Sequence, residues 1–308
     1  MQVLCVPRVL CVEDFDLIRA SPRRKNLISV VQLGTVDYSA GLCLQQRLVA
    51  LRKEEKIGDV LLLLEHTPVI TLGRNAKAAN VVASPGLLTQ RGVELFECDR
   101  GGDVTFHGPG QIVGYPIFDL RSHAYGAADA PVRGDESKTR PDPARKTLGV
   151  IEFVRRLEQV LIRTCADFAI PTKRVPGLTG VWTNPADNDA HVGTGALALP
   201  AERSSTANLA MSNHPEAKLA AIGVHISRSV TSHGFALNVN TDLSFFNLIV
   251  PCGITTKKVT SMRQELGRAL DLNAVAESIS RNFGVVFLSQ ILWLESLDAL
   301  LRPAVGAP

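Results

Sequence analysis

One cysteine of the chain stands in a setting that could display a reactive thiol. Cys252 lies between Pro251 and Gly253, after the apolar run Leu248 to Val250 and before a Thr/Lys segment, which favours a turn. A thiol attacks a carbonyl as its thiolate, so it needs a neighbour that stabilises the negative charge. From the residue types alone, the candidate neighbours are His107, His225, His233, Lys257 and Lys258. Because an isolated cysteine is commonly a packed core residue, this setting alone favours catalysis only weakly.

A glycine-rich segment, residues 100–111 (RGGDVTFHGPGQ), is the second candidate for chemistry. Gly101 and Gly102 allow positive φ and a close approach of the backbone, and Gly108-Pro109-Gly110 predicts a tight turn. Backbone N–H groups exposed in this way can bind a carbonyl or an anion. The alternative is a pair of structural turns around a short strand, with His107 bonded to a backbone group.

The glycine-rich segment, continued through Tyr115, closely resembles the signature of the lipoyl(octanoyl) transferases, also called lipoate-protein ligase B. The other blocks that carry the resemblance are Gly73-Arg74-Asn75, Gly180-Val181-Trp182, Ala221-Ile222-Gly223-Val224, Ser232-His233-Gly234-Phe235-Ala236-Leu237-Asn238 and Pro251-Cys252-Gly253-Ile254. They occur in order and cover most of residues 28–270. The resemblance implies an α/β (α+β) fold, a biotin/lipoate protein ligase-like catalytic domain in which helices flank a mixed sheet.

The resemblance also implies a reaction and its residues. Cys252 would take an octanoyl group as a thioester and pass it on, assisted by a lysine shortly before the Ala221–Val224 block. That lysine is Lys218, because no other lysine lies between Lys173 and Lys257. The residues implied to bind the acyl chain are Arg100, Gly101, Gly102, Asp103, Val104, Thr105, Phe106, His107, Ala221, Ile222, Gly223, Gly234, Phe235 and Ala236.

The implied partners are carrier proteins. The donor is octanoyl-acyl carrier protein, and the acceptors are the lipoyl domains of 2-oxoacid dehydrogenase acyltransferase subunits and the glycine cleavage H protein. A thioester is already activated for amide formation, so we expect no cofactor and no ATP. In agreement, the sequence has no G-x-G-x-x-G after a strand and no G-x-x-x-x-G-K-[ST] phosphate loop.

Three other functions are compatible with the residues. An ATP-dependent lipoate- or biotin-type ligase would use Lys218 and leave Cys252 incidental. A non-catalytic module that binds a lipoyl group would function without the thiol. A cysteine–histidine amidase would pair Cys252 with one of the histidines.

Composition narrows the class of protein further. The 308 residues are 45% hydrophobic and 20% charged, with a formal net charge of +3, which is typical of a globular domain and gives no indication of nucleic-acid binding. The six cysteines form no C-x-x-C pair, so we expect neither a metal site nor a disulfide framework. No apolar run is long enough to span a bilayer, and acidic residues near the N-terminus disfavour a signal or transit peptide. We therefore expect a cytoplasmic enzyme.

The elements that must position these residues follow from the apolar patterns. Strands are predicted at Leu27 to Leu33, Val60 to Leu64, Val69 to Leu72, Ala220 to Ile226 and Gly234 to Val239. Helices are predicted from Tyr38, after an Asp37 cap, to about Lys56, from Leu148 to Phe168, and over most of the chain from Leu266 onward.

The domain plan has one catalytic domain over residues 27–290, between an N-terminal extension (1–26) and a C-terminal tail (291–308). Polar, Pro- and Ala-rich composition marks loop insertions at 122–146 and 185–216. The second insertion ends just before Lys218. In the resembled family, only a few residues separate the Gly-Val-Trp block from this lysine.

Overall fold

The computed structural model describes residues 27–123, 147–184, 216–251 and 258–301. Cys252 lies outside the described residues, as do the predicted N-terminal extension and most of the two predicted insertions. Ser122, His123 and Glu216 are the parts of the insertions that are described.

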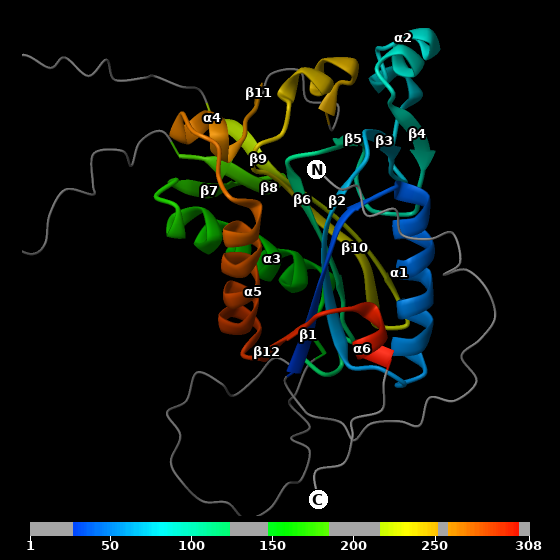
Figure 1. The fold of residues 1–308 in the computed structure, drawn as a ribbon, viewed down its shortest axis with the longest axis vertical. Coiled ribbons are helices and arrows are strands. Elements are labelled where there is room, and N and C mark those ends of the chain that lie inside the picture. The colour runs from blue at the N-terminus through cyan, green and yellow to red at the C-terminus, as the bar shows by residue number, and fades with distance from the viewer. Residues whose placement is uncertain (1–26, 124–146, 185–215, 252–257, 302–308) are drawn as a thin grey trace, which may run out of the picture.

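A nine-stranded mixed sheet forms the centre of the fold (Figure 1). The strands lie in the order β12 (Gln290–Leu294), β1 (Leu27–Val36), β2 (Asp59–His66), β6 (Gln111–Ile117), β10 (Val230–Asn238), β9 (Ala217–Ser227), β8 (Leu178–Thr183) and β7 (Thr172–Val175), and β11 (Lys258–Val259) pairs with β9. β1 is parallel to β2 and β12, and β11 is parallel to β9. The other pairs are antiparallel, so the predicted mixed sheet is confirmed.

A second, three-stranded sheet and the helices surround this centre. The small sheet has the order β4 (Glu94–Glu97), β3 (Val69–Leu72), β5 (Val104–His107). The α-helices are α1 (Tyr38–Lys53), α2 (Pro85–Gln90), α3 (Val150–Asp167), α4 (Met262–Leu266), α5 (Leu272–Phe287) and α6 (Leu297–Leu301), and the 3-10 helices are η2 (Ala78–Asn80) and η4 (Leu243–Leu248).

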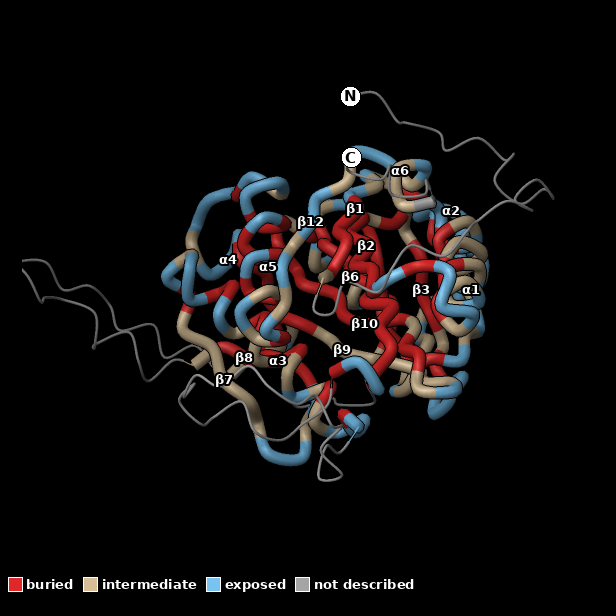
Figure 2. The backbone as a smooth tube through the Cα atoms, turned by 90° about the horizontal axis from the view of Figure 1, so that it is seen from below, coloured by how far each residue is buried: buried red, intermediate tan, exposed pale blue. Residues whose placement is uncertain are grey.

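Strand β2 shows why the large sheet is covered on both faces. Leu61 and Leu63 point into an apolar cluster formed with α3 and α5, whereas Leu62 and Leu64 point into a second cluster formed with α1. This alternation follows from the two-residue period of a strand. Figure 2 shows the result, a buried sheet between two layers of helices.

Helix α1 begins where it was predicted but ends earlier. The side chain of Asp37 accepts a hydrogen bond from Ala40 N at 2.8 Å, which satisfies one of the free N–H groups of the first turn. The helix ends at Lys53 rather than near Lys56, because Glu55 has a φ of 58° and turns the chain out of the helix.

Strand β1 is longer than predicted. The strand was predicted to end at Leu33, before Gly34, yet pairing with β2 continues to Val36. The register shifts between Gln32 and Thr35, and Gly34 has a φ of 66°. The glycine therefore forms a bulge inside the strand, a role that only its freedom at positive φ permits.

The C-terminal part of the chain corrects the predicted domain boundary at residue 290. Residues 290–294 were expected to be helix and then tail, but they form β12, which pairs in parallel with β1 from Leu27↔Gln290 to Val31↔Leu294. A short apolar run such as Gln290–Leu294 fits a helix or a strand equally well. Pairing with the edge of β1 makes it a strand. The described domain therefore extends through α6.

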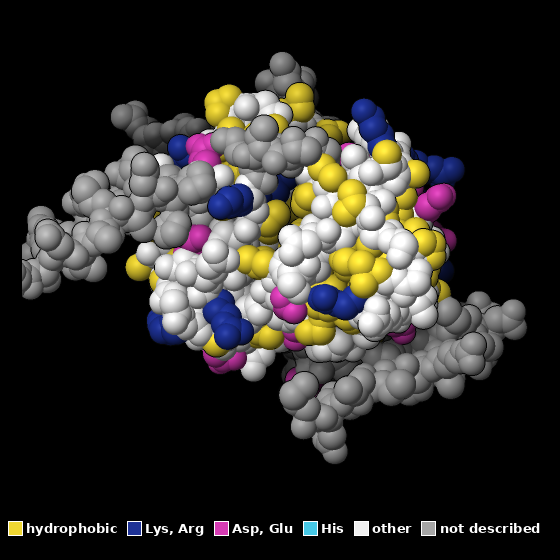
Figure 3. Space-filling model, turned by 90° about the horizontal axis from the view of Figure 1, so that it is seen from above, with side chains coloured by type: hydrophobic (Ala, Val, Ile, Leu, Met, Phe, Trp, Pro, Cys, Tyr) yellow, Lys and Arg dark blue, Asp and Glu magenta, His cyan; other side chains and the backbone are white. Residues whose placement is uncertain are grey.

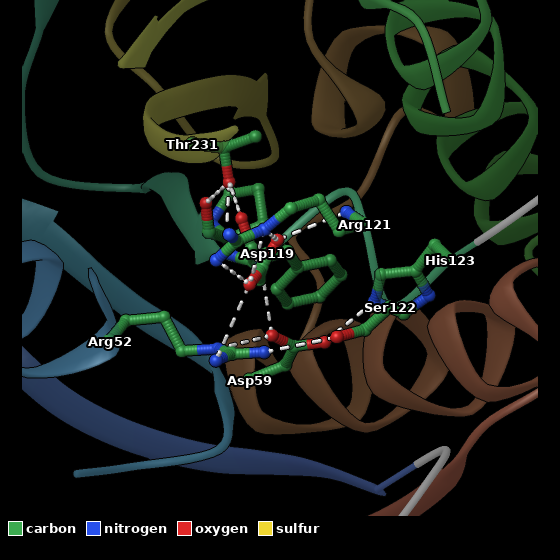
Figure 4. A network of polar contacts seen from close by, with 9 residues as sticks. Arg52, Asp59, Asp119, Arg121, Ser122, His123 and Thr231 are labelled. Atoms are coloured by element: carbon green, nitrogen blue, oxygen red, sulfur yellow. Dashed lines mark hydrogen bonds and ion pairs between the residues drawn. The ribbon is translucent and has the colours of Figure 1, made fainter. Parts of the chain in front are cut away.

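A polar network fixes the end of β6 that lies away from Gln111 (Figure 4). Asp59 accepts hydrogen bonds from Arg52 Nε at 2.8 Å, from the backbone N of Asp119 at 2.9 Å and from His123 Nε2 at 2.6 Å. Asp119 in turn accepts three side-chain hydrogen bonds from Arg121. The network secures the chain up to His123, which lies within the first predicted insertion and is the last described residue before position 147.

Candidate active site

A cavity of about 380 Å³ lies where the glycine-rich segment crosses β9 and β10. Among the residues predicted to bind the acyl chain, it is lined by Arg100, Gly101, Gly102, Asp103, Val104, Thr105, His107, Ala221, Ile222, Gly223, Gly234, Phe235 and Ala236. Lys218 lines it as well. The structure thus brings together residues from three sequence blocks that are far apart in the chain.

Small residues on β9 and β10 make room for this cavity. The strands pair as Ala221↔Ala236 and Gly223↔Gly234, so two successive cross-strand pairs on the same face of the sheet have almost no side chain. A Cβ added to Gly223 would lie 2.6 Å from the carbonyl oxygen of Gly101. The glycine-rich segment can therefore approach the sheet closely only because this position is glycine.

The block Gly73-Arg74-Asn75 holds the glycine-rich segment from the other side. Arg74 N donates to Arg100 O at 3.0 Å, and Asn75 N donates to Gly102 O at 3.1 Å. Gly102 has the positive φ that was predicted, 95°. The segment is thus clamped between the small sheet and β9, to which Gly101 N donates at Val224 O, 3.0 Å.

The turn at Gly108-Pro109-Gly110 is also confirmed. Gln111 N donates to Gly108 O at 3.2 Å, and Gly110 has a φ of 80°. This combination, with proline before a residue of positive φ, is that of a type II turn. It returns the chain from β5 into β6.

Arg100 uses its guanidinium to hold the segment rather than to face solvent. Its side chain donates to Thr71 O at 2.7 Å, to Thr71 Oγ1 at 2.9 Å and 3.2 Å, and to the carbonyl of Gly101 at 3.1 Å. With these donors directed at the protein, Arg100 fixes the position of the cavity wall.

Phe106 is the one predicted acyl-binding residue that the structure places elsewhere. Along β5, Thr105 and His107 face the cavity, and the strand alternation turns Phe106 to the opposite side. Its ring stacks on Phe245 with a centroid distance of 4.7 Å in a separate apolar cluster. The prediction that all of residues 100–107 line the site is therefore wrong at Phe106.

The cavity also contains ring side chains that the sequence did not single out, Tyr38 and Tyr115. Tyr115 OH donates to His66 Nε2 at 2.6 Å, and His66 Nδ1 in turn donates to Val36 O at 2.8 Å. The sequence gives only a weak indication of these two tyrosines. Tyr38 was predicted as the first residue of a helix, and Tyr115 was noted as the end of the glycine-rich block.

The buried histidines at or behind the cavity wall are uncharged at neutral pH. Burial lowers the pKa of His107 to about 3 and that of His66 to about 4. Burial also lowers the pKa of His233, against the opposing effect of its 2.7 Å contact with Asp99. A neutral imidazole brings no positive charge to a thiolate, so His107 and His233 lose their place among the candidate cations.

Lys218 lies where β9 meets β8 and β11. It pairs with Trp182 on one side and with Val259 on the other, and Thr260 N donates to its carbonyl at 3.0 Å. A smaller cavity of about 20 Å³ shares Thr105, Lys218, Ala221 and Ala236 with the larger one and is also lined by Pro251 and Val259.

Among the described residues, no group of three or more His, Cys, Asp or Glu side chains could hold a metal ion. In the same part of the chain, no helix is long and apolar enough to cross a membrane. Seen from above, hydrophobic side chains gather over the right-hand part of the molecule (Figure 3). Val82 and Leu87 are among the exposed large hydrophobic residues.

This fold and cavity correspond to a known class of catalytic domain. The sequence profile of the lipoyl protein ligase A/B catalytic domain matches residues 37–132 and 141–284. The chain therefore belongs to this family.

Two relatives make the comparison more specific. An octanoyltransferase of Koribacter versatilis is 56% identical over 282 residues, which is 92% of this chain and 93% of the relative. An octanoyltransferase of Acidobacterium capsulatum is 48% identical over 277 residues, 89% and 96% of the two chains. The recognition of the transferase family from its sequence blocks is confirmed.

Solved structures share the fold. A bi-partite lipoate protein ligase from Thermoplasma acidophilum superposes with a TM-score of 0.55 at 12% identity, over 88% of this chain and 87% of its own. A lipoate-protein ligase A bound with ATP gives 0.53 at 11% identity, over 88% of both chains. At such identities the likeness concerns the fold alone, and it agrees with the predicted fold class.

Proposed function

We propose that this chain transfers an octanoyl group from acyl carrier protein to the lysine of a lipoyl domain, through a thioester on Cys252. Lys218 is the second catalytic residue. The acceptors are the lipoyl domains of 2-oxoacid dehydrogenase acyltransferase subunits and the glycine cleavage H protein. The reaction uses no nucleotide and no metal.

The observation that carries this proposal is the position of the two residues that flank the undescribed segment 252–257. Pro251 lines the same small cavity as Lys218. Lys258 pairs with Ala217, the neighbour of Lys218, on β9. The described residues on either side of the segment, Pro251 and Lys258, therefore lie close to Lys218, which supports a site in which Cys252 and Lys218 act together.

The first half of the reaction is an exchange between two thioesters. The Cys252 thiolate attacks the octanoyl carbonyl carbon, a new C–S bond forms, and the C–S bond to the carrier breaks. The carrier thiol leaves as a thiolate and takes up a proton from the Lys218 ammonium, which becomes a neutral amine. The Lys218 ammonium stabilises the attacking thiolate before this step, because opposite charges at short distance favour the charged form.

The second half forms the amide. The neutral amine of the acceptor lysine attacks the Cys252 thioester, a C–N bond forms, and the bond to Cys252 breaks. The neutral Lys218 amine takes up the proton lost by the acceptor amine, which restores the ammonium beside the departing Cys252 thiolate. Since amide formation from a thioester is downhill, neither half needs ATP.

The larger cavity is the proposed acyl site. It is lined by the small residues of β9 and β10 and by Val113 and Phe235. Each buried methylene of the octanoyl chain contributes about 0.8 kcal/mol to binding. The cavity therefore supplies affinity and a preference for chain length.

The test is intact-mass analysis after mixing the protein with octanoyl-acyl carrier protein in the absence of ATP. We expect one octanoyl adduct that hydroxylamine removes and that Cys252→Ala abolishes. Cys98→Ala is the matched control and should keep the adduct, since Cys98 Sγ is engaged with Leu72 O. Absence of the adduct in the wild type, its persistence in Cys252→Ala, or a requirement for ATP would overturn the proposal.

A further inference from the structure

The side chain of Lys218 rests on the ring of Trp182. The ammonium nitrogen lies 5.0 Å from the ring centroid, within the range of a cation–π interaction. Trp182 is itself 1% exposed. A ring buried on all other sides presents one face to the cation, so the contact is fixed from the side of the tryptophan.

An irregularity of the sheet places Lys218 opposite this ring. Val181 pairs with Ala220, whereas the next residue, Trp182, pairs with Lys218, so the register shifts and Leu219 is an extra residue in β9. Such a bulge re-aims the side chains beside it. Leu219 points into the apolar core, and Lys218 reaches the wall shared by the two cavities.

Gly180 completes the setting for the lysine. It has a φ of 122°, and a Cβ at this position would lie 3.1 Å from Lys218 Cε and 2.5 Å from Ala220 O. Glu158 of α3 accepts a hydrogen bond from Gly180 N at 3.2 Å and so fixes the strand at this point. The absent side chain leaves the space through which the lysine stem passes.

We propose that Trp182 is a positioning residue for the reaction, and that its ring holds the Lys218 ammonium at the wall shared by the two cavities. The inference rests on the proposed function, since it concerns the same lysine. Lysine has a flexible four-carbon stem that can adopt many rotamers. The ring favours the rotamers that keep the ammonium at the wall of the cavity, and it does so without a second buried charge.

The choice of an aromatic partner rather than a carboxylate has a chemical reason. A carboxylate beside Lys218 would neutralise the charge that the thiolate needs. Among the described acidic residues, Glu216 pairs with Lys173 at 2.8 Å and Glu158 pairs with Arg155 and Arg174. Lys258, on β11, is exposed. The ring attracts the ammonium and leaves its charge available.

The experiment measures the alkylation rate of Cys252 by iodoacetamide against pH, read at the level of the Cys252 peptide by mass spectrometry. Trp182 is replaced by tryptophans of increasing fluorination in a Trp293→Phe background, since the chain has two tryptophans. Fluorine weakens the attraction of the ring for a cation and barely changes its volume. We expect the half-maximal pH to rise step by step, with alkylation at pH 7 slowed about threefold to tenfold for the most fluorinated ring.

Genetic variants provide a second measurement. Trp182→Phe, whose ring attracts a cation less strongly, should shift the profile part of the way, and Trp182→Met should reproduce the full shift and lower kcat more than KM. Val181→Ala is the matched control on the same strand, because it loosens the opposite face of β8 and should leave the pH profile unchanged. In a Lys218→Ala background, the Trp182 substitutions should cause no additional shift.

The two proposals fail in different ways. If the wild type forms no octanoyl adduct, the proposed function fails. If it forms the adduct and Lys218→Ala shifts the profile, but fluorination of Trp182 does not, only the positioning role is wrong.

Discussion

At the scale of single residues, the site is defined by which groups are charged. The sequence offered five possible partners for the Cys252 thiol, and burial removes His107 and His233 because it keeps them neutral. Lys218 is a cation at the wall shared by the two cavities. Lys218 could be predicted as the partner of the thiol from the family's sequence blocks. The exclusion of His107 and His233 depends on their burial, which no sequence pattern reveals.

The first prediction separates the charge of Lys218 from its ability to carry protons. Lys218→Ala should raise the pH of half-maximal Cys252 alkylation and slow octanoyl transfer by about 10²- to 10⁴-fold, the usual contribution of a general acid–base group. Lys218→Arg keeps a positive charge but cannot release a proton. It should therefore retain much of the alkylation profile and still lose transfer.

The measurements are peptide-level alkylation against pH and single-turnover transfer from octanoyl-acyl carrier protein. Cys43 and Cys98, both partly buried, provide internal reference rates in the same sample. An alkylation profile identical to that of the wild type in Lys218→Ala would remove the lysine from its role.

At the scale of elements, the cavity is a consequence of strand pairing. Alternation explains why Thr105 and His107 line it and Phe106 does not, and this could have been predicted once β5 was recognised as a strand. The meeting of Ala221 with Ala236 and of Gly223 with Gly234 could not, because the register of β9 against β10 depends on long-range pairing.

The second prediction concerns these paired small residues. Ala221→Leu would fill part of the cavity, so octanoyl transfer should fall relative to hexanoyl transfer by about tenfold, the equivalent of two methylenes. Ala78→Leu adds the same side chain at an exposed position of η2 and should leave the ratio unchanged. Competition between the two acyl carriers, read by intact mass, gives the ratio directly. An unchanged ratio in Ala221→Leu would place the acyl chain outside this cavity.

At the scale of the whole molecule, the C-terminal part of the described chain belongs to the core. β12 extends the sheet beyond β1, Ile291 packs against the α3 and α5 side, and Leu294, Leu297 and Leu300 pack against the α1 side. The sequence pattern predicted a tail here because five residues are too few to show a period. The free edge of β1, contributed by residues more than two hundred positions away, makes them a strand.

The third prediction tests this placement by truncation. Removal of residues 290–308 deletes β12 and α6, leaves β1 with an unpaired edge and exposes apolar side chains on both faces of the sheet. Each buried aliphatic side chain contributes about 1.5–3 kcal/mol, and the whole domain has only about 5–15 kcal/mol of stability. We therefore expect a loss of most of the cooperative thermal transition, or aggregation.

Removal of residues 302–308 alone keeps every described element and should leave the transition temperature within a few degrees of the full chain. Equal transition temperatures for the two truncated proteins would show that residues 290–301 add no stability to the domain and form a tail.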